Sequence, residues 1–185
     1  AASRKGSPRI RQYFYLIEDE LQYLPDTPDN GNDHFRVLGL KLWHDGSPYT
    51  GSMYTSFPYL DSPLGRTLGI QGGTHGSAMI APDALVDKLR QYSAKGWQVA
   101  IHSQGDASNR AVLAAVDKAG SLAGPAPVVR VEHGVFMPRE SVEQLARLKV
   151  TPSFHVHHIK YYGDALANSI VGLAAAQQTL PVRSA

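Results

Sequence analysis

Short apolar segments with the composition of β-strands alternate with segments of helical periodicity along most of the chain. This alternation restricts the possible folds more than any other feature. The strand-like segments are brief and rich in Val and Ile, which is typical of a parallel sheet separated by helices. Connections in such a sheet are right-handed and give either an open doubly wound sheet or a (β/α)8 barrel. The pattern predicts the α/β class without choosing between these two forms.

Five segments are expected to be strands: 9–17, 35–42, 97–102, 128–133 and 150–156. Four are expected to be helices, namely Pro82 to a stop at Gly96, 108–119, a helix opened by Pro138, and 164–180. Residues 18–33 are expected to form a loop around a short helical turn, and residues 120–127 a second loop. Residues 47–79 are rich in Gly and Pro and show no periodicity. A loop of this length is usually functional or disordered.

Composition excludes several kinds of site and partner. The 185 residues carry a formal net charge of +2, with Lys and Arg scattered, so neither a nucleic-acid nor a membrane partner is expected. Cysteine is absent, so a metal would have to be held by His, carboxylate or modified Lys. The first six residues lack Met and an apolar signal core, which indicates an internal cut or a processed end. We expect a soluble protein, cytoplasmic rather than exported.

Polar side chains that can contribute to a metal site end three of the expected strands. These residues are Lys41, His102 and His133. In parallel α/β folds the active site is built at the carboxyl ends of the strands. Alternation along a strand places Lys41 with Val37 and Gly39, His102 with Ala100, and His133 with Val129 and Val131. If such small and branched residues line a barrel interior, all three polar groups lie at its mouth.

Each of these residues also has an ordinary structural interpretation. A single His at a strand end is more often a hydrogen-bonding residue than a ligand, and a single Lys there is usually solvated. Three such residues at equivalent positions on separate strands favour a common functional site.

The segments around these residues resemble those of a known family. KLWHDG (41–46), HSQGD (102–106) and RVEH (130–133), in this order, resemble the amidohydrolase superfamily, in particular the amidohydrolase 3 family of formamide-deformylase-like enzymes. TGSMY (50–54), PY (58–59) and HIKYYGD (158–164) are similar to further segments of that family. The resemblance runs from about residue 9 to the end. It implies a fragment of a (β/α)8 barrel, approximately strands 3 to 7 with their helices.

The resemblance also implies a chemistry. Lys41, carboxylated by carbon dioxide, and the neutral imidazoles of His102 and His133 are expected to bind one or two divalent ions, with zinc the expected metal. The metal would activate a water to hydroxide, which would hydrolyse a non-peptide, amide-type C–N bond of a small-molecule substrate. The family's His-x-His pair and its general-base Asp have no counterpart here. Residues 1–185 are therefore expected to be a partial hydrolase domain, inactive alone and able to self-associate as a homo-oligomer.

Other residues receive secondary roles. Tyr54 and His158 are expected to contact substrate, while Asp45 and Asp106 are expected to support the ligands, Asp106 also by capping the helix that follows. The pair His155-x-His157 has metal-ligand spacing, but a role in the pocket or on the surface is favoured for it. Arg130 and Glu132 are expected to lie opposite His133 and to pair with each other or with the helices.

Two other classes of function stay open. The chain can be a non-metal α/β domain whose histidines hydrogen-bond a small polar ligand, or an assembly module without activity. Bound divalent metal separates the enzyme from the first alternative. The activity of a longer chain, compared with this one, separates it from the second.

Overall fold

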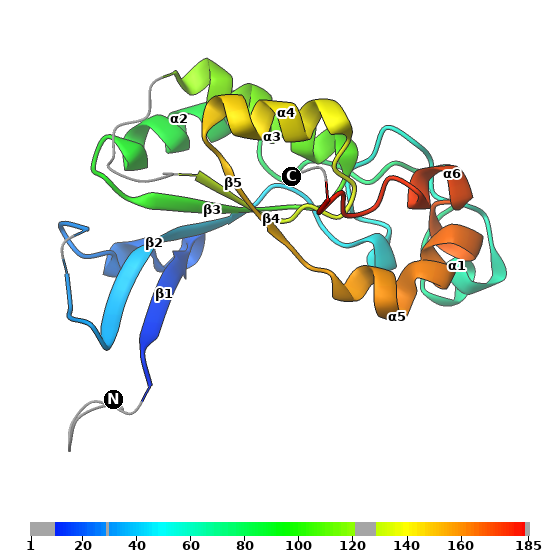
Figure 1. Ribbon diagram of the computed structural model, residues 1–185, viewed down its shortest axis with the longest axis horizontal. Coiled ribbons are helices and arrows are strands. Elements are labelled where there is room, and N and C mark those ends of the chain that lie inside the picture. The colour runs from blue at the N-terminus through cyan, green and yellow to red at the C-terminus, as the bar shows by residue number, and fades with distance from the viewer. Residues whose placement is uncertain (1–9, 29, 121–128, 184–185) are drawn as a thin grey trace.

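A parallel β-sheet of five strands organises the described part of the chain (Figure 1). The computed structural model describes residues 10–28, 30–120 and 129–183. The strands are β1 (Gln12–Ile17), β2 (Phe35–Trp43), β3 (Gln98–Ser103), β4 (Val129–His133) and β5 (Thr151–Phe154), and they lie side by side in sequence order. All four pairings are parallel. The predicted α/β class is confirmed, and the strand order lacks the reversal of a doubly wound sheet.

Helices cover one face of this sheet. Figure 1 shows α2 (Pro82–Ser93), α3 (Asp106–Ala119) and α4 (Arg139–Leu148) together on that face, where they follow β2, β3 and β4 in the chain. Consecutive parallel strands with their helices on one side are the arrangement found in a (β/α)8 barrel. The expectation of a barrel fragment is consistent with this arrangement.

The remaining elements are short. They are the 3-10 helices η1 (Glu18–Tyr23) and η2 (Pro48–Thr50), the helices α1 (Pro63–Thr67), α5 (His157–Ala165) and α6 (Leu173–Ala176), and the π-helical turn η3 (Leu166–Ile170). The single helix expected over 164–180 is therefore wrong. The chain becomes helical at His157, where a strand was expected to have just ended, and Gly172, with φ of 88°, separates η3 from α6.

Local sequence explains the helix that precedes β3. Pro82 occupies its first turn, where the missing N–H costs nothing. Leu85 and Leu89 are fully buried against the sheet. After Ser93 the chain reverses at Gly96, whose φ of 81° is a left-handed conformation that glycine adopts without steric cost. These features confirm the helix predicted from Pro82 to Gly96.

The main core lies between the sheet and the three helices. Neighbouring strands contribute aligned side chains: Leu42 pairs with Ile101 and Ile101 with Val131, and all three are fully buried. Helix residues such as Leu89, Val112 and Leu145 pack against this face. Burial of each such side chain contributes about 1.5–3 kcal/mol relative to exposure.

A second apolar cluster orders the long segment that follows β2. Met53, Tyr59 and Ile70 of this segment pack with Phe136, Leu166, Ile170 and neighbouring apolar residues. The segment expected over 47–79 thus has little regular structure but a core of its own, and it is ordered by packing against chain from beyond β4.

The structure corrects the expected faces of β4. Val129 and Val131 were expected on the face that carries the polar site, but they lie in the core under the helices. The register instead aligns Trp43 with His102 and His102 with Glu132 on the opposite face. Strict alternation would then direct His133 toward the helices, together with Val131.

Some expectations concern residues outside the described ranges. These are the proposed cut or processed end at residues 1–6, and the loop expected over 120–127 from residue 121 onward. Among the helices of the described ranges, none is both long and apolar enough to cross a membrane.

Replacing Ile101 by Ala tests the main core. Ile101 is 0% exposed, so we expect the substitution to lower the free energy of unfolding by about 2–5 kcal/mol through lost burial and the cavity left behind. Ile159→Ala is the matched control, because Ile159 is 52% exposed, and it should change stability by about 1 kcal/mol or less. Urea unfolding followed by circular dichroism measures both. Equal losses in the two variants would contradict the placement of β3 in the core.

Candidate functional site

Two histidines meet at the carboxyl edge of the sheet. The ring centroids of His102, in β3, and His133, at the end of β4, are 4.5 Å apart. The charge of Lys41, from β2, acts on both imidazoles, so the three residues share one electrostatic environment. The structure therefore brings together the three residues predicted as ligands, while their role as ligands stays a prediction.

An unusual backbone conformation brings His133 to His102. Its φ is +76°, a region that residues other than glycine seldom occupy. Extended backbone would have left its side chain on the helix face with Val131, whereas the left-handed φ breaks the alternation. Such a conformation costs about 1–3 kcal/mol and is typically retained at functional sites.

Burial keeps these side chains in forms that can donate an electron pair. Burial, together with the charges of the neighbouring His102, Lys41, His155 and His158, lowers the pKa of His133 to about 4. The pKa of His102 is also lowered, mainly by burial. Burial lowers the pKa of Lys41 to about 8, against an opposing effect of Glu132. Near pH 7 both imidazoles are neutral, and the Lys41 amine loses its proton more easily than an exposed lysine does.

Asp45 connects the loops that follow β2 and β3. Its fully buried carboxylate accepts backbone N–H bonds from Tyr54 (3.1 Å), Gln104 (3.0 Å) and Gly105 (2.9 Å). Burial nevertheless raises the pKa of Asp45 to about 6, because the three N–H bonds offset only part of the desolvation. The two loops pack so closely that a Cβ on Gly105 would lie 1.8 Å from the carbonyl oxygen of Tyr54. Asp45 therefore holds the two loops together next to His102, while its support of the metal ligands stays a prediction.

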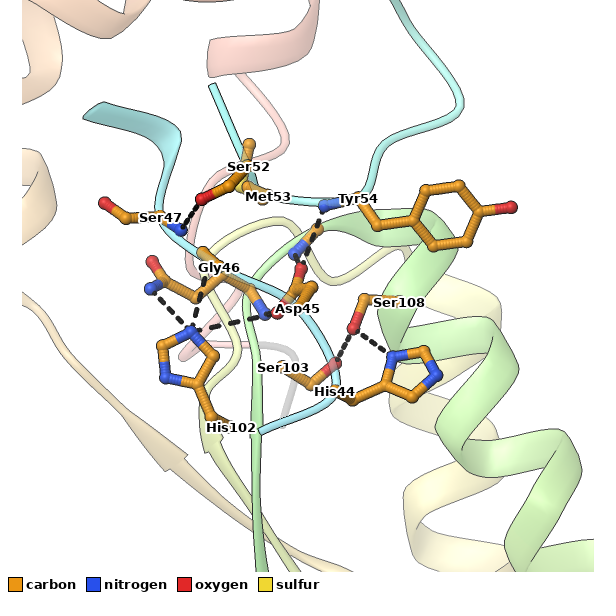
Figure 2. Close-up of polar contacts among 12 residues, drawn as sticks. His44, Asp45, Gly46, Ser47, Ser52, Met53, Tyr54, His102, Ser103 and Ser108 are labelled. Carbon is orange, nitrogen blue, oxygen red and sulfur yellow. Dashed lines mark hydrogen bonds and ion pairs between the residues drawn. The ribbon is translucent and has the colours of Figure 1, made fainter. Parts of the chain in front are cut away.

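The same loops fix the ring of His102 (Figure 2). Its Nε2 lies 3.1 Å from the carbonyl oxygen of Gly46 and 3.8 Å from Oδ1 of Asp45. A carbonyl oxygen only accepts, so Nε2 carries the proton and Nδ1 holds the free electron pair. Nε2 of Gln104 lies 3.0 Å from Nε2 of His102, and Oε1 of Gln104 is buried without a partner among the described residues. If the Gln104 amide is rotated by 180°, its Oε1 takes the place of its Nε2 and accepts a hydrogen bond from Nε2–H of His102. His102 then has a second acceptor, and Oε1 has a partner.

A buried chain of hydrogen bonds runs from His44 to Asn109, and Figure 2 shows its members His44, Ser108 and Ser103. His44 Nδ1, Ser108 Oγ, Ser103 Oγ and Asn109 Oδ1 are linked at 2.8, 2.7 and 2.8 Å. Asn109 Nδ2 donates to the carbonyl oxygen of Phe136, so Oδ1 must accept the proton of Ser103. The proton between the two serines is then that of Ser108, which leaves His44 to donate from Nδ1 to Ser108 Oγ. Burial lowers the pKa of His44 to about 4, which keeps it neutral.

Further histidines extend the pair away from the sheet. The ring of His155 lies 5.8 Å from His133 and 4.8 Å from His158, and His157 stacks on Tyr161. His155 thus lies beside His133, and both His155 and His157 are exposed, so the role of the pair in the pocket or on the surface stays a prediction. His158 is buried beside His155, close to the two ligand candidates.

Other candidates are placed differently from the prediction. Asp106 does not cap its helix: it is the first residue of α3, and its carboxylate accepts hydrogen bonds from Ser56 N (2.9 Å), Ser56 Oγ and Arg110 (2.6 Å). It attaches the long segment after β2 to α3. The Tyr54 ring points away from His102 in Figure 2, so only its backbone contributes to this region and its contact with substrate stays a prediction.

Arg130 and Glu132 form an ion pair of 2.9 Å, as predicted. Their side chains lie on the face of Lys41 and His102, because Lys41 aligns with Ala100 and Ala100 with Arg130. The expectation that this face lies opposite His133 is therefore wrong, since the φ of His133 returns its ring to this side.

Several functional candidates carry no signal in the sequence. Tyr49 and Ser108 come next to the site only through long-range contacts with His158 and His44, whereas Gln104 contacts His102 two residues away. The one available signal was proximity, because Gln104 directly follows the His102 strand. Within the described ranges, no group of three or more His, Asp or Glu side chains is arranged to hold a metal ion. A metal held here would need Lys41 or residues from elsewhere.

Comparison with known proteins agrees with the motifs. The family model described as "Amidohydrolase family" matches residues 13–185. No curated protein matches the chain. Two similar solved structures are uncharacterized metal-dependent hydrolases, from Pyrococcus furiosus (TM-score 0.76, 24% identity, 96% of this chain covered) and from Pyrococcus horikoshii OT3 (0.75, 23%, 95%). This chain spans 35% and 33% of their lengths, so it corresponds to about a third of each.

Asp45→Asn tests the connection between the loops. Asparagine has one acceptor oxygen in place of two, so its amide N–H group would face backbone donors that Asp45 now satisfies. We expect a loss of about 2 kcal/mol or more in the free energy of unfolding. Asp61→Asn, which alters an exposed ion pair with Arg66, should have little effect. Urea unfolding at pH 7 compares the variants, and equal stability of Asp45→Asn and the unsubstituted chain would contradict the role of Asp45.

The pH dependence of stability tests the neutral histidines. His44, His133 and His158 have lowered pKa values of about 4, so their contributions to stability are present above pH 6.5 and are lost as pH falls toward 4. Asp45 acts oppositely, since its raised pKa of about 6 makes its contribution fall as pH rises from 4 to 6. The three histidines should outweigh it. Unfolding free energies measured between pH 4 and 7 should therefore increase with pH.

His44→Asn isolates one of these contributions. The Asn amide retains a donor near the Nδ1 position but does not titrate, so the stability gained between pH 4 and 6.5 should shrink by on the order of 3 kcal/mol. An unchanged pH profile in this variant would show that His44 is not buried as a neutral side chain.

Proposed function

Because the chain belongs to the amidohydrolase family, we propose that it is part of a metal-dependent hydrolase whose divalent ion is held by Lys41, His102 and His133. The observation that carries this proposal is the meeting of two neutral imidazoles, 4.5 Å apart, with Lys41 in the same electrostatic environment. Neutral imidazoles are ligands for zinc and similar ions. We propose zinc as the metal.

The donor set fits such an ion. The Gly46 carbonyl holds Nε2–H of His102, which leaves Nδ1 as the ring nitrogen with a free electron pair. Lys41 becomes a ligand only when its amine is deprotonated or modified. Its lowered pKa of about 8 favours carboxylation: the neutral amine attacks carbon dioxide, a C–N bond forms, and one proton is released. The resulting carboxylate supplies oxygen ligands.

The reaction we propose is hydrolysis of an amide-type, non-peptide C–N bond in a small molecule. A bound divalent metal lowers the pKa of a coordinated water toward about 7 and polarises a carbonyl group. The protein's own contribution is to keep the imidazoles neutral by burial and to orient His102 through Gly46 and Asp45. The solved structures of similar fold are described as metal-dependent hydrolases, which supports this class of reaction.

The metal content of histidine variants tests this function. In the complete protein that carries this sequence, His102→Ala and His133→Ala should each lose most of the zinc retained after dialysis, because each removes one of few ligands. His34→Ala is the matched control: His34 precedes β2 at the opposite end of the strand and should leave the zinc content unchanged. Elemental analysis gives the readout.

Full zinc content in both site variants would contradict the proposal, and so would a complete protein without bound metal. The isolated residues 1–185 serve as a comparison. We propose that they bind metal weakly and hydrolyse no amide, since the described part of the chain lacks a third unmodified ligand.

A further inference from the structure

Tyr49 and His158 form a pair that the candidate metal ligands do not explain. Tyr49 belongs to η2, after β2, and His158 to α5, after β5. The Tyr49 hydroxyl lies 2.6 Å from Nδ1 of His158, and the two rings stack with centroids 5.5 Å apart. His158 is only 6% exposed. A hydrogen bond across 109 residues of sequence thus fixes one buried imidazole at the edge of the site.

Chemistry decides the direction of this hydrogen bond. A phenol O–H is a stronger donor than an imidazole N–H, and an unprotonated imidazole nitrogen is a stronger acceptor than a phenol oxygen. Burial raises the pKa of Tyr49, so the hydroxyl keeps its proton, and burial lowers the pKa of His158 to about 4, so the ring is neutral. Tyr49 therefore donates to Nδ1, and the proton of His158 resides on Nε2.

The Nε2–H group of His158 is left as a donor near the predicted metal ligands. His158 contacts His155, His155 contacts His133, and His133 contacts His102, with ring centroids 4.8, 5.8 and 4.5 Å apart. The charges of both His155 and His102 act on His158. Within the described part of the chain, no residue accepts a hydrogen bond from Nε2. A ligand beside His133 is well placed to supply the acceptor.

We propose that His158, held by Tyr49, donates a hydrogen bond from Nε2 to an acceptor oxygen of the ligand that lies beside His102 and His133. The acceptor is a carbonyl oxygen in an amide or a carboxylate oxygen in the acid formed from it. Tyr49 is the positioning residue. This inference rests on the proposed function for the identity of the ligand, but the donor itself depends only on the structure.

A neutral donor fits such a ligand. Because His158 is uncharged near pH 7, it can bind an uncharged amide oxygen and a carboxylate by the same hydrogen bond. The Tyr49 bond also prevents the ring from presenting an unprotonated Nε2, which would repel either oxygen. Substrate selection by this residue therefore depends on the position of an acceptor and not on net charge.

Nuclear magnetic resonance of the chain tests the donor directly. Residues 1–185, labelled with ¹⁵N in their histidines and kept metal-free with a chelator, are titrated with sodium acetate at pH 7, with sodium chloride as the salt control. We expect Nδ1 of His158 to appear as an unprotonated nitrogen and Nε2 as a protonated one before acetate is added. Acetate, but not chloride, should shift the Nε2–H resonance in a saturable way.

Three variants separate the roles. His158→Phe keeps an aromatic ring but removes the donor. It should weaken acetate binding by about tenfold or more, as measured from the chemical-shift change of the His133 resonance during the titration. Tyr49→Phe should remove the change in the ¹⁵N chemical shift of Nδ1 that the hydrogen bond causes, and it should weaken acetate binding severalfold. Tyr161→Phe is the matched control: this residue lies in α5, is 62% exposed, and its loss of a hydroxyl should change neither readout.

Either of two results in the unsubstituted chain would overturn the proposal: a proton on Nδ1 of His158, or no response of Nε2–H to acetate. A variant that fails to fold does not alter that test, because both readouts come from the unsubstituted chain. The outcome is also separable from the metal proposal. If the complete protein holds no metal but acetate still shifts Nε2–H, the proposed hydrolase function fails and the His158 donor site stands. If the complete protein holds zinc but acetate does not shift Nε2–H, the hydrolase function stands and the role of His158 in ligand binding fails.

Discussion

The buried carboxylate of Asp45 is the contact on which the arrangement of this edge of the sheet depends. It accepts N–H groups from Tyr54, Gln104 and Gly105, which belong to two loops that pack against each other. A neutral side chain of this size cannot accept three backbone donors without leaving one unpaired. The pKa of Asp45 is raised, because burying the carboxylate costs more desolvation free energy than the three N–H bonds return. Gly46, the next residue, then orients His102.

Two features of the structure build the site. Packing of the sheet against the helices fixes the strands, and unusual backbone conformations at the strand ends orient the polar side chains. One face of the sheet is filled by apolar side chains and helices, which fixes the strands. The other carries Lys41, His102, Arg130 and Glu132 in aligned rows. Burial has two effects on these residues. It keeps the imidazoles neutral, and it strengthens each hydrogen bond that fixes a ring. The strained φ of His133 is tolerated because this frame holds the residues on either side.

Sequence reasoning succeeded where a feature is local. The α/β class, the helix from Pro82 to Gly96 and the family motifs follow from periodicity, turn residues and residue order, and the structure and the family match bear them out. It failed for Val129 and Val131, which lie under the helices, and for Asp106, which attaches Ser56 instead of capping its helix. Those errors share a cause. Alternation and capping rules assume regular backbone, and they do not anticipate which distant segment will compete for a side chain.

The sequence by itself determined that strands and helices alternate, and that Lys41, His102 and His133 lie within the last three residues of successive strands, because strand periodicity and helix signals are encoded within about ten neighbouring residues. Only the tertiary structure decided that His133 turns toward His102, that Gly46 fixes the His102 tautomer, and that Tyr49 meets His158. These contacts join residues up to 109 positions apart. They form because packing of the sheet, helices and loops brings those residues together, and no local pattern specifies that packing.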